Sequence, residues 1–212
     1  MKLTSHLFIL ISISVLSLQQ LQAQHIKIDK KILSFLADEK QINVIFTFEN
    51  TIIDNDVPET EFLVKMNKKI TRLANQEEAS NWLKEYYKHK NEIWGDAFLN
   101  MLNKKVSNFK NSPYFTSDIN ANYSMLVNTK WMYYGYDAGI TDMPAKLTLI
   151  LTFYKTNEPN NILYTTKISR AEGTYNKTKG DNEGVGPSLN RMRKAYIKAA
   201  YKLAQSFKRV VD

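Results

Sequence analysis

The chain has 212 residues, of which 43% are hydrophobic and 12% aromatic, so it can bury a core and does not have the composition of a disordered protein. It contains no cysteine, which excludes disulfides, thiol catalysis and metal sites built from cysteine and histidine. The formal net charge of +8 favours acidic partners, although a solvated basic surface without a specific ligand explains it more simply.

Residues 1–23 have the three parts of a secretory signal peptide. Lys2 supplies a positive charge, Leu7–Leu18 is almost wholly apolar, and a polar stretch then ends on the small residue Ala23. The apolar run is shorter than the roughly 20 residues that a membrane-spanning helix needs. We therefore expect cleavage near Ala23, leaving residues 24–212 as a single α/β domain in the periplasm or outside the cell. We expect no lipid anchor, no transmembrane segment in the mature chain and, in that compartment, no nucleic-acid partner.

The amino-terminal part of the expected domain predicts one strand followed by helices. Gln41–Glu49 alternates apolar and polar side chains with a period of two, which is typical of a strand. Asn50–Thr60 contains Asp54, Asp56 and Pro58 and predicts a polar loop. Helices are expected at Asp29–Leu36, Glu61–Leu73 and Glu77–Phe109, the last with a break near Lys90 and Asn91.

The carboxy-terminal part predicts a run of strands and one closing helix. Alternation along Leu147–Phe153 predicts that Leu149 and Phe153 are buried in a central strand. The closing helix is predicted to begin with Pro187 at its first helical position and to run to about Val210. The predicted strands are Tyr114–Ser117, Tyr123–Tyr133, Ala145–Tyr154 and Ile162–Arg170, the last two joined by a short turn and therefore antiparallel.

This order of elements predicts an α+β fold, with a largely antiparallel or mixed sheet of four to five strands and helices packed against it. It resembles the small exported α/β domains of Gram-negative envelopes grouped with the TolB amino-terminal domain and the curli secretion lipoprotein. The segment Tyr134–Ile140 is similar to one in uncharacterised exported proteins of gut anaerobes. The resemblance implies a fold and an envelope setting, without catalytic residues or a cofactor. It is carried by the strand Ile42–Phe48, the helix around Trp94 and Phe98, the strands Tyr123–Trp131 and Leu147–Phe153, and a final helix with Arg191, Ala195 and Tyr196.

The residue types that usually carry catalysis form no recognisable constellation. His89 has no nucleophile beside it in sequence and is expected on a solvated helix surface. A calcium loop starting at Asp54 would need glycine and glutamate where Glu59 and Lys65 stand. The glycine-rich loop 180–186 lacks the lysine and spacing of a phosphate-binding loop. The sequence therefore predicts no catalytic residue, metal site or cofactor.

An aromatic cluster follows the Tyr123–Tyr133 strand into the next loop. Planar rings at a strand end can stack on sugars or apolar groups, and such rings are enriched at binding surfaces. Strand alternation predicts that Trp131 and Tyr133 point into the core while Tyr134 points the other way. Core packing is the simpler interpretation of the cluster, and a binding rim is the alternative. The candidate binding residues are Trp131, Tyr134, Tyr136 and Asp137.

The closing helix carries a second candidate surface. It contains no acidic residue between Leu189 and Val211, while its lysines recur at four-residue steps beside the apolar stripe. Lys194, Lys198 and Lys202 are therefore candidates for docking to an anionic envelope component or a protein, with a solvated helix face as the simpler reading.

Two functional hypotheses follow from these patterns. The leading one is a non-enzymatic, exported domain that binds an envelope component or an extracellular ligand. The alternative is a carboxylate-dependent hydrolase acting on glycan, which a cleft that brings together two or three acidic side chains would favour.

Overall fold

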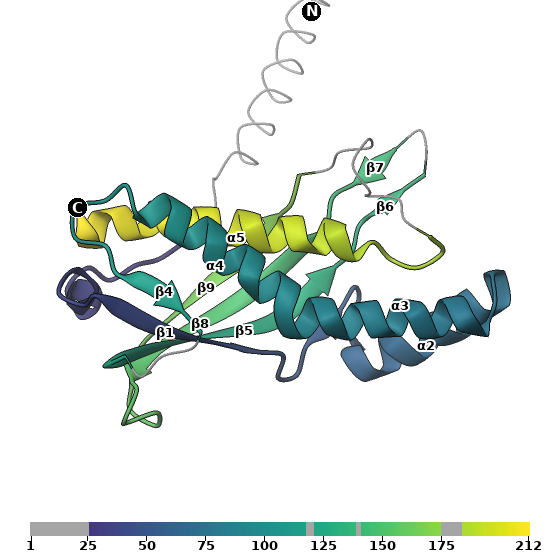
Figure 1. Cartoon of the computed structure of the whole chain (residues 1–212), viewed down its shortest axis with the longest axis horizontal. Helices are drawn as coiled ribbons and strands as arrows, with labels where there is room; N and C mark the ends of the chain where they lie inside the picture. Colours follow the sequence, from purple (N-terminus) through teal and green to yellow (C-terminus); the bar gives the residue numbers. More distant parts are fainter. Residues whose placement is uncertain (1–25, 118–120, 139–140, 175–183) are drawn as a thin grey trace, which may run out of the picture.

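The computed structural model describes residues 26–117, 121–138, 141–174 and 184–212 (Figure 1). The predicted signal peptide and most of the glycine-rich loop 180–186 lie outside these residues. Within the described part of the chain, no helix has the length and apolar character needed to cross a bilayer.

The centre of the fold is a mixed sheet of seven strands. Its longest members pair antiparallel in the order β5, β8 and β9, while β1 and β2 both run parallel to β5. The strands are β1 (Gln41–Thr47), β2 (Ile52–Ile53), β3 (Val57–Pro58), β4 (Tyr114–Thr116), β5 (Tyr123–Tyr133), β8 (Lys146–Lys155) and β9 (Ile162–Glu172). The predicted α+β class is confirmed, and the sheet has more strands than the four to five that were predicted.

The additional strands come from the segment that was predicted to be a polar loop. Asn50, Asp54 and Asp56 have φ values of 54°, 53° and 62°, a left-handed conformation that asparagine and aspartate tolerate. These residues turn the chain tightly enough for β2 to pair with β5 and for β3 to pair with β2. Strands of two residues are too short to produce a detectable period, so the sequence pattern missed them.

Helices occupy the segments predicted for them. The predicted break near Lys90 is a single turn of π-helix, η3 (His89–Ile93), which joins two α-helices without an interruption of the helical chain. The helices are η2 (Ile32–Ala37), α2 (Glu59–Leu73), α3 (Gln76–Lys88), α4 (Trp94–Val106) and α5 (Leu189–Val211). Two further strands, β6 (Tyr136–Asp137) and β7 (Asp142–Met143), form a separate hairpin.

The core lies between the sheet and the α4–α5 pair, which packs over one face (Figure 1). Leu149 and Phe153 are completely buried in β8, between β5 and β9, and Phe153 contacts Phe207 of α5 at 6.2 Å between ring centres. The predicted burial of Leu149 and Phe153 is therefore confirmed. Trp94 joins the two helices, because its ring stacks on Tyr196 at 5.5 Å and its indole N–H donates to the Leu189 carbonyl.

The start of α5 differs from the prediction by two residues. The helix begins at Leu189, and Ser188 is its N-cap, with a side-chain oxygen that accepts a hydrogen bond from the Arg191 amide at 3.2 Å. Pro187 therefore lies outside the first turn and does not occupy the first helical position. A serine cap satisfies an amide that would otherwise have no intrahelical partner, so it sets the helix start more strongly than the proline does.

The two faces of β5 are reversed at its end with respect to the prediction. Tyr134 is only 4% exposed and lies on the core side, whereas Trp131 and Tyr133 are partly exposed on the opposite face. The cause is a β-bulge in the pairing with β8, between Thr129 and Trp131. One extra residue at Lys130 shifts the alternation by one position, so every later side chain changes face.

Candidate functional site

A pocket of about 510 Å³ lies where β5 ends, and we call it the β5-end pocket. Four segments far apart in sequence supply its walls: the turn between β2 and β3, helix α2, the chain from β5 into β6, and the approach to α5. Its lining residues are Asp54, Phe62, Met66, Lys69, Tyr133, Tyr134, Gly135, Tyr136, Asp137, Gly184, Val185, Gly186, Pro187, Ser188 and Arg191.

Aromatic side chains form one wall and the rim of this pocket. The rings of Phe62 and Tyr134 stack face to face at 5.5 Å, which places α2 against the end of β5. Gly135 follows with a φ of +68°, and a Cβ there would lie 2.0 Å from the Met143 carbonyl oxygen. Only glycine fits this turn, which sends the chain out of β5 and leaves Tyr136 46% exposed at the rim.

The Tyr134 hydroxyl is buried in the wall, beside the Tyr86 hydroxyl. Burial raises the pKa of Tyr134 well above its ordinary value, and the neighbouring Tyr86 hydroxyl offsets part of that rise. Tyr134 therefore lines the pocket as a residue, while its hydroxyl is buried near Tyr86, Tyr196 and Glu59.

The pocket also contains charges of both signs. Asp54 is exposed to solvent, although desolvation of its carboxyl still raises the pKa. Asp137 lies across the β6–β7 hairpin from Asp142. Arg191 is only 4% exposed, and Lys69 stands on the exposed side of α2. Two carboxylates and two cations therefore line one cavity, an arrangement suited to a polar ligand that both donates and accepts hydrogen bonds.

A buried polar cluster adjoins the pocket behind Tyr134. The Tyr86 hydroxyl donates to Glu59 at 2.7 Å, and the Lys90 ammonium lies 2.5 Å from the same carboxylate oxygen. Lys90 also lies over the Phe48 ring, 4.7 Å from its centre. These contacts fix the π-helical turn against α2 and so hold Phe62 in the pocket wall. The sequence offered only the interrupted helical period near Lys90 as a signal for this cluster.

The structure brings some of the predicted binding residues together and separates others. Tyr134, Tyr136 and Asp137 all line the β5-end pocket, with Tyr134 in its buried wall and Tyr136 at its rim. Trp131 lies on the other face of the sheet, between the Tyr133 ring at 6.3 Å and the Arg170 guanidinium at 5.5 Å.

The predicted lysines of the closing helix lie at the partly exposed surface of α5. Lys194, Lys198 and Lys202 are all partly exposed there, and none of them lines the β5-end pocket. The His89 Nδ1–H donates a hydrogen bond to the Glu85 carbonyl oxygen, at 2.9 Å.

The sequence patterns missed several pocket residues. Phe62 and Lys69 belong to helix α2, and Arg191 belongs to helix α5. No spacing in the sequence relates these residues to Asp54, because the sheet brings them together only after folding.

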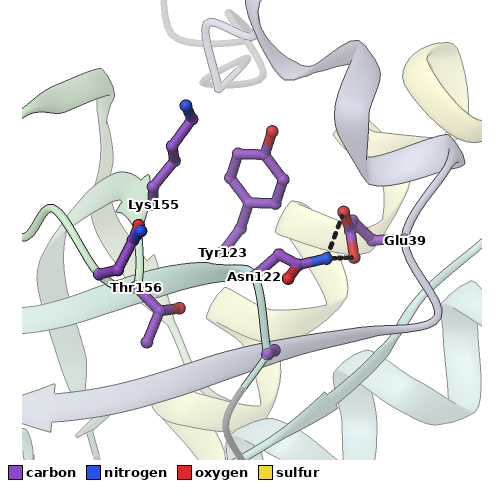
Figure 2. A pocket seen from close by; sticks show the side chains of 7 residues that line it. Glu39, Asn122, Tyr123, Lys155 and Thr156 are labelled. Carbon is purple, nitrogen blue, oxygen red and sulfur yellow. Dashed lines mark hydrogen bonds between the residues drawn. The ribbon is translucent and has the colours of Figure 1, made fainter.

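A second pocket, of about 560 Å³, lies at the opposite end of β5. Figure 2 shows Glu39 and Asn122 joined by hydrogen bonds of 3.2 Å, with Tyr123 standing between Glu39 and Lys155 in this view. The Tyr123 ring stacks on Phe35 at 4.0 Å, which fixes η2 over the start of β5. This pocket contains none of the predicted binding residues, and its polar lining belongs to strand ends and turns.

Within the described ranges, no group of three or more acidic or histidine side chains could hold a metal ion. Comparison with known proteins finds no family model that matches the chain, no matching curated protein and no matching solved structure.

Proposed function

We propose that the chain is an exported, non-enzymatic binding domain and that its β5-end pocket holds a polar ligand from the envelope or the extracellular medium. The observation that carries the proposal is the convergence of four distant segments on one cavity of about 510 Å³. That cavity combines tyrosine rings with carboxylate and guanidinium groups, which is the mixture expected of a site for a small polar molecule.

A ligand screen by thermal shift and NMR tests this proposal, with common sugars, amino acids and organic acids as probes. Tyr136→Ala should abolish the binding of any hit, because it removes the ring at the pocket rim without disturbing the core. Tyr114→Ala is the matched control, since Tyr114 is 58% exposed in β4, outside the pocket lining. Hits that bind both variants equally well would place the binding site elsewhere.

The alternative function, a carboxylate-dependent hydrolase acting on glycan, gains support from one feature of the same pocket. Asp54 and Asp137 both line it, and the raised pKa of Asp54 is the property required of a general acid. Nitrophenyl glycosides provide a direct assay. If hydrolysis is found and is abolished by both Asp54→Asn and Asp137→Asn, the non-enzymatic proposal is wrong.

The proposal includes the compartment and a second partner. Export of residues 24–212 predicts a mature chain that begins near Gln24, which mass spectrometry of protein from the producing cell would detect; an intact Met1 would contradict it. The basic face of α5 supports an anionic envelope component as that partner. The likeness to the TolB amino-terminal domain and the curli secretion lipoprotein stays a prediction.

A further inference from the structure

The outer surface of the α4–α5 pair holds a cluster of cations that the sequence pattern did not reveal in full. Lys105 of α4 and Lys198 of α5 converge on Tyr201, with ammonium groups 5.3 and 5.4 Å from the centre of its ring. Lys202 follows Lys198 by one helical turn. We call Lys105, Lys198, Tyr201 and Lys202 the Tyr201 surface, and each of them is partly exposed.

Within the described part of the chain, the lysines of the Tyr201 surface form no ion pair with an acidic side chain. Partial burial and the charge of Lys198 both lower the pKa of Lys202, while Glu172 raises it. The Glu172 carboxylate already lies 2.8 Å from Lys146, which takes up much of its charge. Helix α5 supplies no acidic side chain of its own between Leu189 and Val211. A negatively charged partner would therefore relieve a repulsion that the folded chain leaves in place.

The residue types at this surface indicate which anion fits. Lysine is a compact point charge on a flexible stem and lacks the planar fork with which arginine grips a fixed carboxylate. A flexible ammonium group can follow an anionic group whose position along a surface is not fixed. Tyrosine is amphipathic and is enriched where a bilayer meets water. The charges come from α4 and α5, which lie side by side (Figure 1).

We propose that the Tyr201 surface docks the domain on the headgroups of an anionic lipid bilayer. This inference rests on the proposed anionic envelope partner and gives it a chemical class. It is independent of the β5-end pocket, because none of the four residues lines that pocket. Loss of membrane docking and loss of ligand binding can therefore be distinguished experimentally.

Co-sedimentation with vesicles tests the inference. Wild-type protein should bind vesicles that contain 30% phosphatidylglycerol, bind pure phosphatidylcholine much more weakly, and dissociate as salt rises, because exposed charges are screened over about 8 Å at physiological ionic strength. Each lysine near an anionic surface contributes about fivefold to the partition coefficient. The triple variant Lys105→Gln, Lys198→Gln, Lys202→Gln should therefore bind roughly 100-fold more weakly.

Two comparison variants make the result specific. Replacing the same three lysines by arginine should preserve binding, because arginine keeps the charge. Replacing Lys68, Lys84 and Lys88 by glutamine removes the same net charge from exposed positions on α2 and α3 and should leave binding nearly unchanged.

Equal losses in both glutamine triples would show that net charge alone attracts the vesicles, and would overturn the inference. Failure of wild-type protein to bind phosphatidylglycerol vesicles at low salt would also overturn it, while leaving the pocket proposal intact. Thermal melts of every variant check the fold, and the glutamine triple on the Tyr201 surface should melt no lower than wild type.

Discussion

Replacing Leu149 by alanine should lower the free energy of unfolding by about 3–4 kcal/mol. The side chain is completely buried, and Leu149 pairs with Thr129 of β5 on one side and with Ile168 of β9 on the other. The substitution removes three carbon atoms from the core, at about 0.8 kcal/mol each. Strands on both sides and α5 above prevent the site from collapsing, so a cavity term of about 1 kcal/mol or more adds to the transfer term.

Urea denaturation followed by circular dichroism measures this loss. With a slope of roughly 2 kcal/mol per molar for a domain of this size, the midpoint should fall by about 1.5–2 M. The control is Ile150→Ala, because Ile150 is the next residue of β8 and lies partly exposed on the opposite face. It should cost about 1 kcal/mol. A loss below about 0.5 kcal/mol for Leu149→Ala, or a larger loss for Ile150→Ala, would refute the assignment of the two faces.

Three further predictions concern the pocket and the helix above it. Gly135→Ala should destabilise the protein by about 1–3 kcal/mol and abolish ligand binding, because the φ of Gly135 is +68° and the new Cβ would clash with the Met143 carbonyl oxygen. Thermal melts measure the first effect, and the ligand screen measures the second. Asp54→Asn should raise the melting temperature more at pH 7 than at pH 3. The folded-state pKa of the Asp54 carboxyl is raised, so the wild-type protein loses stability as the pH rises above the unfolded value of 3.8, and asparagine removes that loss. An equal gain at both pH values would contradict this. Tyr196→Phe should lower the free energy of unfolding by about 1–2 kcal/mol in urea melts, because it removes the hydroxyl that bonds the buried Thr129 hydroxyl at 2.6 Å. An unchanged free energy would mean that Thr129 has a different hydrogen-bond partner in the variant.

The central strands were predictable because the alternation of buried and exposed side chains depends only on neighbouring residues of one strand. Leu147–Phe153 buries alternate residues along an uninterrupted strand face, so its period of two survives in the folded sheet. The closing helix was predictable for the same reason, since its apolar stripe packs along its whole length against the sheet and α4. Each of these elements has one buried face, and the apolar residues of that face recur in the sequence with the period of a strand or of a helix.

The prediction failed where a single residue or a distant contact decides the structure. The bulge at Lys130 moves Tyr134 into the core, and a one-residue insertion leaves no trace in hydrophobic periodicity. The pocket depends on Asp54, Phe62 and Arg191 meeting, which requires the parallel pairing of β2 with β5 and the packing of α2 and α5 at the same end. Such long-range pairings are set by the whole fold and have no local signature.

The bulge in β5 also gives the β5–β8 hairpin a competing way to fold. In the pairing without a bulge, Trp131 and Tyr133 would face inward, and these large rings bury as much apolar surface as the side chains that replace them. The native pairing prevails through contacts made beyond the hairpin, namely the stacking of Tyr134 on Phe62 and the bond from the Trp131 indole to the Asp54 carbonyl, at 2.8 Å. The register at the end of this hairpin is therefore set by α2 and the β2–β3 turn as well as by the two paired strands.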